Sequence, residues 1–297
     1  MTREPTGLEV APAPFYAAKA LLTRGRSAAW LVRAGGRSQP DGIRILFYHR
    51  VSPERDELAV TPGRFARQMR YLADEGYAVV DVLAAAAMLG GDAPVRKTVA
   101  LSFDDGYLDV AEHGLPVLAE HGFRATVFVP PAVLDGDATF EWYDEQPALL
   151  DWNRIRELDR EGVLSFEAHS LTHPNLLRLG DDDAREEISG SKAALEARLE
   201  RPVEAFSYPA GLYGERERRY VIESGFRVAV SCEPGVNDAA TDRFALRRRQ
   251  IDARDSLLDF KAKVGGGHDS PLPLRDLYRR SRFGADVETP AAASSRR

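Results

Sequence analysis

The chain has 297 residues, of which 44% are hydrophobic and 29% charged, and its formal net charge is −6. These values are ordinary for a globular protein with one large α/β domain or two small ones. The negative charge argues against nucleic acid as the main partner. The single cysteine, Cys232, excludes an intrachain disulfide and a cysteine-rich zinc site. We interpret Cys232 as a small buried residue.

Residues 1–40 are predicted to form a basic segment outside the main domain. The stretch 14–35 interleaves aromatic and aliphatic residues with Lys19, Arg24, Arg26 and Arg33, a pattern typical of helices that rest on an anionic membrane. A helix packed on the domain and a mobile leader are the alternatives. The chain has no apolar run of roughly 20 residues and no signal-peptide pattern, which predicts a cytoplasmic protein, with or without association to the membrane.

Strands and helices alternate through the main domain, which we predict to span residues 41–283. The predicted strands cover 43–51, 77–80, 98–101, 125–129, 164–167, 205–209, 227–231 and 246–251. The predicted helices cover 61–72, 82–89, 108–120, 153–161, 182–200 and a segment that ends at 220–223. This alternation implies a parallel sheet, and seven or eight strands suit a distorted (β/α) barrel of about seven parallel strands. Residues 284–297, rich in Ala and Ser, are expected to be a disordered tail.

Two adjacent carboxylates follow the apolar run 98–101, in the sequence Ser-Phe-Asp-Asp-Gly at 102–106. Neighbouring like charges raise each other's pKa, and neither carboxylate favours leaving water. A chain tolerates such a pair where one carboxylate binds a cation and the other carries out proton chemistry. The alternative interpretation is that Asp104 and Asp105 cap the helix predicted at 108–120.

Two histidines four residues apart follow the predicted strand 164–167. His169 and His173, together with one Asp, form a ligand set that suits a divalent metal with open coordination positions. Pro174 disfavours a helical conformation at His173, so we expect a loop to carry the pair. In barrels of this type the chemistry occurs at the C-terminal ends of the strands. The position of both motifs directly after strands therefore predicts one shared site.

These motifs resemble those of the polysaccharide deacetylase family, also called the NodB-homology or carbohydrate esterase 4 domain, over roughly residues 43–251. In that family the first Asp of Phe-Asp-Asp-Gly is the general base and the second is a metal ligand, which implies these roles for Asp104 and Asp105. A His-Ser/Thr-x-x-His segment supplies the other two ligands, here His169 and His173. The resemblance also implies an N-acetylated glycan as the substrate.

The third family motif, Arg-x-Pro-Tyr-Gly, is altered here to Ser-Tyr-Pro-Ala-Gly at 207–211. The family uses the backbone N–H at the Tyr position to bind the oxyanion, and Ala210 can keep this role because a side-chain change leaves the N–H in place. Ser207 stands where the family has its Arg, so another residue must orient Asp104. We predict Arg248 for this role, and the alternative is that Arg248 lies on a solvated strand edge.

The sequence Tyr-His-Arg-Val at 48–51 and the altered third motif are similar to the biofilm poly-N-acetylglucosamine deacetylases, in which the domain is circularly rearranged. That resemblance implies that His49 is the general acid. The common family takes its acid from a late Leu-x-His segment, which this chain lacks. Its one late histidine, His268, lies in a Gly-rich segment that we expect to be flexible, so we favour His49.

The implied reaction is hydrolysis of an N-acetyl group by metal-activated water, with Asp104 as base and His49 as acid. Two imidazoles and one carboxylate suit Zn²⁺, and Co²⁺, Ni²⁺ or Fe²⁺ are alternatives. An O-acetyl esterase or a non-peptide amidase would use the same residues. A carbohydrate-binding relative that has lost catalysis is the alternative from another functional class.

Aromatic faces pack well on the apolar faces of sugar rings, and several aromatic residues follow predicted strands. The candidates for a sugar groove are Tyr107, Trp142, Tyr143, Tyr208 and, among polar residues, Arg154 and Arg156. We expect Trp152, which directly precedes a predicted helix, to pack in the core instead.

Overall fold

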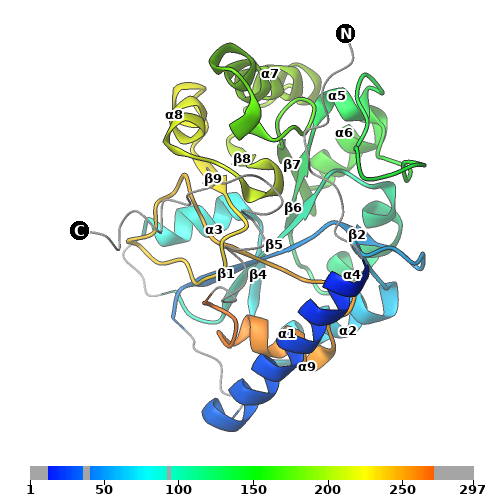
Figure 1. The fold of residues 1–297 in the computed structure, drawn as a ribbon, viewed down its shortest axis with the longest axis vertical. Helices are drawn as coiled ribbons and strands as arrows, with labels where there is room; N and C mark the ends of the chain where they lie inside the picture. The colour runs from blue at the N-terminus through cyan, green and yellow to red at the C-terminus, as the bar shows by residue number, and fades with distance from the viewer. Residues whose placement is uncertain (1–12, 36–40, 92–94, 271–297) are drawn as a thin grey trace.

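A parallel sheet forms the centre of the molecule (Figure 1). The computed structural model describes residues 13–35, 41–91 and 95–270. The strands of the sheet are β1 (Ile43–Tyr48), β4 (Ala78–Val80), β5 (Thr98–Asp104), β6 (Ala125–Val129), β7 (Leu164–Ala168), β8 (Ala205–Ser207), β9 (Val228–Val230) and β10 (Arg248–Gln250).

Seven of these strands form a nearly closed barrel. They are hydrogen-bonded in the order β10-β1-β5-β6-β7-β8-β9, and a parallel bridge between Val230 and Leu246 joins β9 to the residues just before β10. The strand β4 lies outside this ring, because it pairs with the first half of β5 along the edge where β6 pairs with the second half. The predicted barrel of about seven parallel strands is confirmed.

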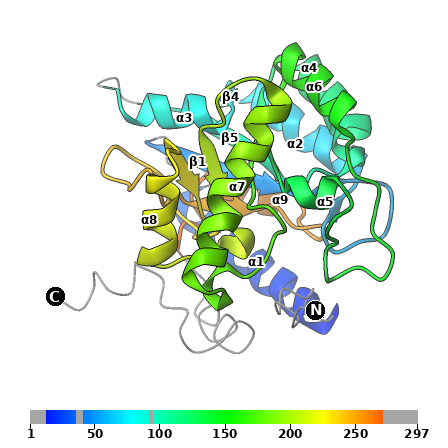
Figure 2. The ribbon, with the colours of Figure 1, turned by 90° about the horizontal axis from the view of Figure 1, so that it is seen from above.

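Helices surround the barrel on its outside (Figure 2). They are α1 (Ala13–Ala34), α2 (Pro62–Asp74), α3 (Val82–Leu89), α4 (Leu115–Glu120), α5 (Pro131–Leu134), α6 (Trp152–Glu161), α7 (Asp181–Leu199), α8 (Glu215–Glu223) and α9 (Leu257–Val264). The shorter elements are a π-helical turn η1 (Val110–Gly114), the 3-10 turns η2 (Leu176–Arg178) and η3 (Pro209–Gly211), and the two-stranded sheet of β2 (Arg50–Val51) and β3 (Ala59–Val60).

Local sequence signals set several helix boundaries. Asp151 accepts a hydrogen bond from the N–H of Arg154 at the start of α6, and Gly162 ends that helix with a left-handed φ of 75°. The helix α7 begins at Asp181 with Gly180 as its N-cap. The acidic run 181–183 therefore fills the first turn, where it interacts favourably with the helix dipole, and does not itself cap the helix.

Several barrel strands are buried along their whole length, which explains why they appear in the sequence as continuous apolar runs. Every residue of β1, β5, β6, β8 and β9 is buried. The exceptions to their apolar composition include Ser102, Asp104 and Ser207, and Arg248 of β10 is buried with them. Buried polar residues on neighbouring strands must hydrogen-bond one another, and here they mark the candidate site.

The structure moves several predicted boundaries. The strand predicted at 98–101 continues to Asp104, which is opposite Phe128 of β6. The strand predicted at 43–51 is divided into β1 and β2 at His49. The strand predicted at 205–209 ends at Ser207, because Pro209 has no N–H for the ladder and begins η3. The helix predicted at 108–120 is π-helical from Val110 and α-helical only from Leu115.

The helix α1 packs along α9, an element that the sequence analysis did not predict. Ser27 of α1 is fully buried, and its Oγ lies 2.7 Å from Oδ1 of Asp259. The ring of Trp30 lies directly against Gly265 and Gly267. This arrangement corresponds to the packed-helix alternative for the stretch 14–35. The predicted tail 284–297 and residues 1–12 lie outside the described residues.

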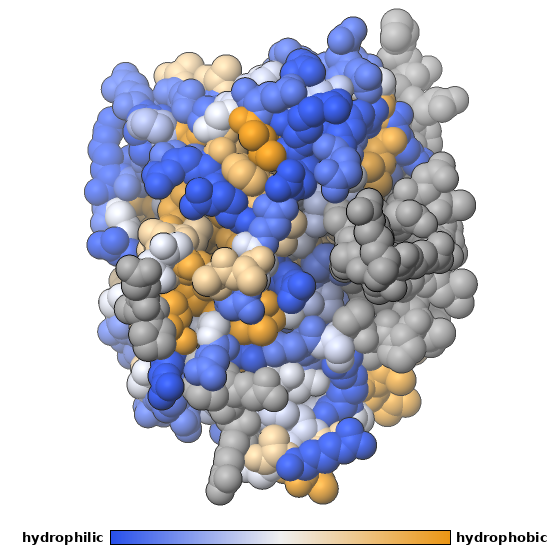
Figure 3. Space-filling model, turned by 90° about the vertical axis from the view of Figure 1, so that its left-hand side faces the viewer, coloured by the Kyte–Doolittle hydropathy of each residue, from blue (hydrophilic) through white to orange (hydrophobic). Residues whose placement is uncertain are grey.

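One side of the molecule is mostly hydrophilic, with small separate apolar areas (Figure 3). None of the helices in the described part of the chain combines the length and the apolarity that crossing a bilayer requires.

Candidate metal and active site

Asp105, His169 and His173 come together at the C-terminal edge of the barrel. Asp105 follows β5, and the two histidines follow β7, which is separated from β5 by β6 alone. Oδ1 of Asp105 lies 3.7 Å from Nε2 of His169 and 3.6 Å from Nε2 of His173. One ligand atom from each residue lies within 4.8 Å of the other two, and all three residues are buried. This arrangement is consistent with a divalent metal site.

Two of the three side chains lack the partners that buried polar groups normally have. Both carboxylate oxygens of Asp105 and Nδ1 of His173 are buried without a hydrogen-bond partner. Burial, together with the charge of Asp104, raises the pKa of Asp105 well above its usual range. Burial lowers the pKa of His169 to about 4, and it holds the pKa of His173 well below its ordinary value. A divalent cation fits this group, because it would pair the carboxylate and bind neutral imidazoles.

Hydrogen bonds from other elements orient the two histidines. Nδ1 of His169 lies 2.7 Å from the backbone oxygen of Ser207, so an Nδ1–H donates there and leaves Nε2 for a metal. The loop between the histidines is held by Glu187 of α7, whose carboxylate accepts hydrogen bonds from the N–H groups of Leu171 and Thr172 and from the Thr172 hydroxyl. The sequence analysis missed Glu187, because nothing in the pattern of α7 distinguishes it from a surface acid.

Backbone strain is concentrated at the same residues. Asp105, Ser170 and His173 have left-handed φ values of 78°, 61° and 59°. A non-glycine residue in this region costs on the order of 1–3 kcal/mol, and such residues cluster at functional sites. The rest of the fold therefore holds these side chains in positions that the local sequence alone would not favour.

Arg248 lies where it can orient Asp104. Its Nη1 donates to Oδ1 of Asp104 at 2.7 Å and its Nη2 donates to Oδ2 at 2.9 Å. Burial raises the pKa of Asp104, but the charges of Arg248, His169 and His49 and the hydrogen bonds from Arg248 together outweigh this effect and hold the pKa below its ordinary value. Ser207, which replaces the family's Arg, accepts a third hydrogen bond from Nη2 of Arg248 at 2.9 Å. The solvated-edge alternative for Arg248 is wrong, because its side chain is fully buried.

His49 follows the last residue of β1, at the same end of the barrel. Its Nδ1 is buried without a hydrogen-bond partner, although the residue as a whole keeps some exposed surface. Burial lowers the pKa of His49, and the charge of Asp104 opposes this shift. The imidazole therefore lies within electrostatic range of Asp104.

His268, the other candidate acid, lies near the opposite end of the barrel. Its neighbour Asp269 pairs with Arg44 at 2.6 Å, and Arg44 is the second residue of β1. Its Nε2 lies 3.1 Å from Oγ of Ser27, and the residue is buried. The expectation of a flexible setting for His268 is thus wrong. Its position still separates it from the residues after the strands.

The turn that contains Ala210 has an unusual backbone. Ala210 has a φ of 52°, and Gly211 after it has a φ of 66°. A Cβ at Gly211 would lie 2.4 Å from the backbone nitrogen of Cys232, so only glycine fits there. Cys232 itself is partly exposed, unlike the buried residue that we predicted, and its Sγ lies 3.8 Å from Nη2 of Arg248. The altered third motif thus packs against Cys232 and, through Ser207, against Arg248.

Two of the four predicted groove aromatics do not face a groove. Tyr208 is fully buried, its hydroxyl donates to the backbone oxygen of Phe244, and its ring stacks on Tyr213 at 4.4 Å. Tyr107 is also fully buried and lies close enough to Asp105 to affect its pKa. Both side chains therefore support the site from behind, because the packed strands leave them no surface for a sugar.

Trp142 and Tyr143 are the partly exposed aromatics beside the site. The ring of Trp142 lies 5.1 Å from that of His173 and is stacked on Phe140 at 4.7 Å. The Tyr143 hydroxyl donates to Oδ2 of Asp56 at 2.5 Å. These contacts fix an aromatic wall, formed by Phe140, Trp142 and Tyr143, on one side of the metal ligands.

A buried arginine is linked to this aromatic wall through hydrogen bonds. Arg50 of β2 donates to Asp109 at 2.7 Å, to Asp56 at 2.8 Å and to Glu54 at 2.7 Å. Asp56 thereby links Arg50 to Tyr143. The pairing of Asp109 with Arg50 could not be predicted from the sequence, because the two residues come from distant segments.

The other candidates lie apart from the site on α6. Arg154 and Arg156 bond to Glu157 and Asn153 of their own helix. Trp152 packs against the main core as predicted, and its Nε1 donates to Asp135.

Comparisons with known proteins agree with this geometry. The sequence profile of the family described as polysaccharide deacetylase matches residues 91–229. The chain is 28% identical over 226 residues to YxkH of Bacillus subtilis (strain 168), a protein provisionally named a polysaccharide deacetylase, and the match covers 76% of this chain and 75% of YxkH.

Two solved structures share the fold over most of the domain. The deacetylase PplD of Streptococcus pyogenes, solved in complex with acetate, superimposes with a TM-score of 0.67 at 25% identity, covering 76% of this chain and 99% of PplD. IcaB from Ammonifex degensii superimposes with a TM-score of 0.67 at 26% identity, covering 77% of this chain and all of IcaB.

Proposed function

Because the chain belongs to the polysaccharide deacetylase family, we propose that it is a metal-dependent hydrolase that removes N-acetyl groups from an N-acetylated sugar or polysaccharide. One observation carries the proposal: the two adjacent carboxylates have opposite environments. Asp104 is paired with Arg248, whereas Asp105 lies unpaired beside two histidines. A charged base next to a cation-binding group is the combination that metal-assisted hydrolysis of an amide uses.

Asp105, His169 and His173 would hold the metal. Two imidazole nitrogens and one carboxylate favour Zn²⁺, with Co²⁺, Ni²⁺ or Fe²⁺ as alternatives. When bound, the ion would polarise the acetyl carbonyl and lower the pKa of water. The buried carboxylate of Asp105 would also gain the counter-charge that the protein does not provide.

Asp104 would accept a proton from the attacking water. Its pKa lies below the ordinary value, so the carboxylate is ready to act as a base at neutral pH. The Ala210 N–H would donate to the oxyanion that develops on the acetyl oxygen, a contribution typically worth about 2.7–4 kcal/mol.

His49 would protonate the leaving nitrogen, because an amine leaves poorly without a proton. Burial lowers its pKa while the charge of Asp104 raises it. The negative charge of the oxyanion would favour the imidazolium in the same way as Asp104 does. Activity should therefore fall on the alkaline side of the His49 pKa.

The aromatic wall would bind the sugar. Trp142 and Tyr143 are partly exposed, and Trp142 is adjacent to His173. A pyranose ring stacked on this wall would hold its N-acetyl group near the metal ligands.

The test is an acetate-release assay on chitin oligomers, poly-N-acetylglucosamine fragments and peptidoglycan fragments, with the metal content of the purified protein measured in parallel. We expect one divalent ion per chain and acetate release from at least one N-acetylated glycan. Release from O-acetylated substrates alone would replace the proposal with an esterase. A protein that binds glycan but no stoichiometric metal would be an inactive relative.

A second arm of the same assay examines the acid. We expect His49→Ala to slow the hydrolysis of amides by about 10²-fold and that of activated aryl esters far less, since a phenolate leaves without a proton. His268→Ala is the matched control and should leave both rates unchanged. Equal losses on amide and ester would remove His49 from the role of acid.

A further inference from the structure

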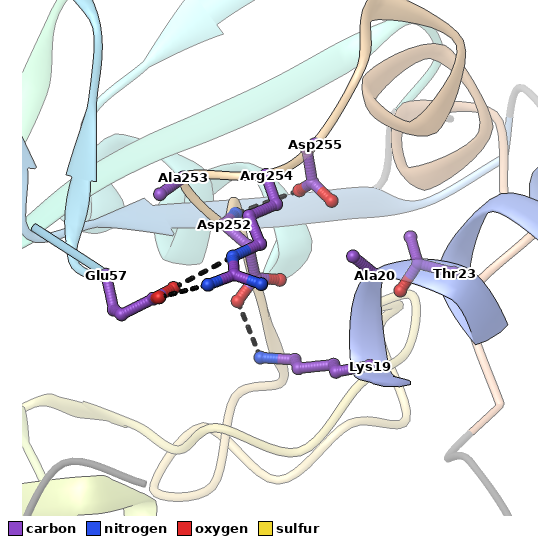
Figure 4. Close-up of a pocket in the computed structure, with 8 residues that line it drawn as sticks. All are labelled: Lys19, Ala20, Thr23, Glu57, Asp252, Ala253, Arg254 and Asp255. Carbon is purple, nitrogen blue, oxygen red and sulfur yellow. Dashed lines mark hydrogen bonds and ion pairs between the residues drawn. The ribbon is translucent and has the colours of Figure 1, made fainter. Parts of the chain in front are cut away.

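The helix α1 is fixed to the domain along one face. Lys19 donates to Oδ1 of Asp252 at 2.6 Å (Figure 4) and to Oε1 of Gln250 at 3.1 Å. Ser27 bonds to Asp259, and Arg26 donates to the backbone oxygens of Gly267 and Ser270. These contacts extend over most of the helix, so its orientation on the domain is set.

The opposite face of α1 is apolar and exposed. Leu21 and Val32 are 72% and 83% exposed, and Leu22 and Leu31 are each 47% exposed. Ala18, Gly25 and Ala28 lie at helical spacing between them. Because the contacts of the inner face prevent rotation, this apolar stripe cannot turn into the core. The large exposed hydrophobic residues of the described chain are concentrated here, since only Met88, Ile222 and Leu257 lie elsewhere.

The charge around the stripe is strongly positive. The helix α1 has four basic residues and no acidic one, although the chain as a whole has a net charge of −6. Arg24 and Arg33 flank the stripe and are exposed. The outward face of α1 is thus basic and apolar, although the chain as a whole is acidic.

We propose that α1 is an interfacial helix that docks the folded protein on an anionic phospholipid membrane. The apolar stripe enters the boundary between headgroups and acyl chains, while Arg24 and Arg33 pair with lipid phosphates. Charge complementarity favours this partner, because an apolar stripe bordered by arginines and without acidic residues attracts an anionic surface. The proposal does not depend on the proposed hydrolysis.

The test is sedimentation of the full chain with vesicles of phosphatidylcholine alone and of phosphatidylcholine with phosphatidylglycerol. We expect binding to the anionic vesicles that weakens as salt is added, and little binding to the neutral ones. Arg24→Gln with Arg33→Gln should weaken binding about fivefold per charge, equivalent to about 1 kcal/mol each. Leu21→Asp with Val32→Asp should weaken it at least tenfold.

The matched control is Met88→Asp with Ile222→Asp, which adds the same two negative charges at exposed apolar positions on α3 and α8. It should bind vesicles like the unmodified chain. Circular dichroism and acetate release from soluble oligomers should be unchanged in all these variants, which excludes unfolding as the cause. Equal losses in the control, no binding to either vesicle, or a Leu21- and Val32-dependent dimer in sedimentation velocity would each overturn the proposal.

Discussion

Two clusters of buried charged groups lie just beyond the ends of barrel strands, and they differ in how completely they are paired. The closed cluster consists of Lys263, Asp252, Asp255 and Lys19. Lys263 donates to Asp255 at 2.5 Å, to Asp252 at 3.1 Å and to the Gln250 oxygen at 2.7 Å, which uses all three protons of an ammonium group. Every charge in this cluster has a protein partner.

The open cluster consists of Asp105, His169 and His173. It is more completely buried than the closed cluster, yet both oxygens of Asp105 and one nitrogen of His173 have no partner. Burial of an unpaired carboxylate is costly, and a protein retains such a group where a ligand completes it. The comparison shows that buried charge alone does not identify a functional site. The absence of a protein partner for the buried charge is what distinguishes the candidate site.

The largest expected effect concerns the base beside the open cluster. Asp104→Asn should lower turnover by about 10³-fold, because the amide cannot accept a proton from water. Metal content should remain at one ion per chain, measured by elemental analysis, since Asp104 is not among the proposed ligands. Turnover close to that of the unmodified protein would show that another group is the base.

The closed cluster should respond in stability instead of turnover. Lys263→Met leaves Asp252 and Asp255 buried with less compensation, and we expect unfolding to become easier by about 3–5 kcal/mol in urea titrations. Below its lowered melting temperature, the variant should hydrolyse substrate at a rate within a few-fold of the original. A loss of turnover without a loss of stability would contradict the structural assignment of this cluster.

In the metal-stripped protein, a substitution that removes the charge of the open cluster should raise the folding stability instead of lowering it. The pKa of Asp105 is raised well above 3.8 in the folded state. Asp105 therefore makes its full favourable contribution to folding stability at pH values below its pKa in the unfolded chain. This contribution is lost as the pH rises through its pKa in the folded protein. Asp105→Asn should make the metal-stripped protein more stable than the original at pH 7 by about 1–3 kcal/mol.

Urea titrations of both proteins between pH 4 and 8 measure this difference, which should shrink toward the acid end. Adding Zn²⁺ should stabilise the original protein and leave Asp105→Asn nearly unchanged. A stabilising effect of Zn²⁺ of equal size in both would place the metal elsewhere.

The smallest effect tests the support of the aromatic wall. Asp56→Asn keeps the size of the side chain but weakens its bonds to Arg50 and Tyr143. Because Asp56 touches no reacting group, we expect KM to rise a few-fold for glycan oligomers while kcat changes less than twofold. Tyr143→Phe should change KM in the same direction. A change in kcat without a change in KM in either variant would show that the aromatic wall does not bind the substrate.

Local patterns were sufficient for the barrel and for the chemical identity of the site. Buried parallel strands appear as apolar runs regardless of their partners, so most of them were found within a few residues. Asp104, Asp105, His169 and His173 were identified because they directly follow such runs. Because the strands are parallel, their C-terminal ends lie at one edge of the sheet. This geometry brings Asp105, His169 and His173 together as predicted.

The residues that complete the site could not be predicted from local patterns. Glu187 bonds to residues 15 and 16 positions away, and Arg50 bonds to Asp109, 59 positions away. Their own surroundings in the sequence resemble those of surface residues. Tyr107 and Tyr208 show the reverse error, because an aromatic residue after a strand has the same appearance in the sequence whether it faces a groove or the core.

The sequence by itself determined the parallel barrel and the residue types of the candidate metal site, since both depend on periodicity and on short motifs. Only the tertiary structure decided that Arg248 pairs with Asp104, that His268 lies near the opposite end from His49, and that α1 presents an apolar stripe outward. These facts depend on which distant segments come into contact in the folded protein. Burial and pairing arise from those contacts and cannot be derived from any single segment.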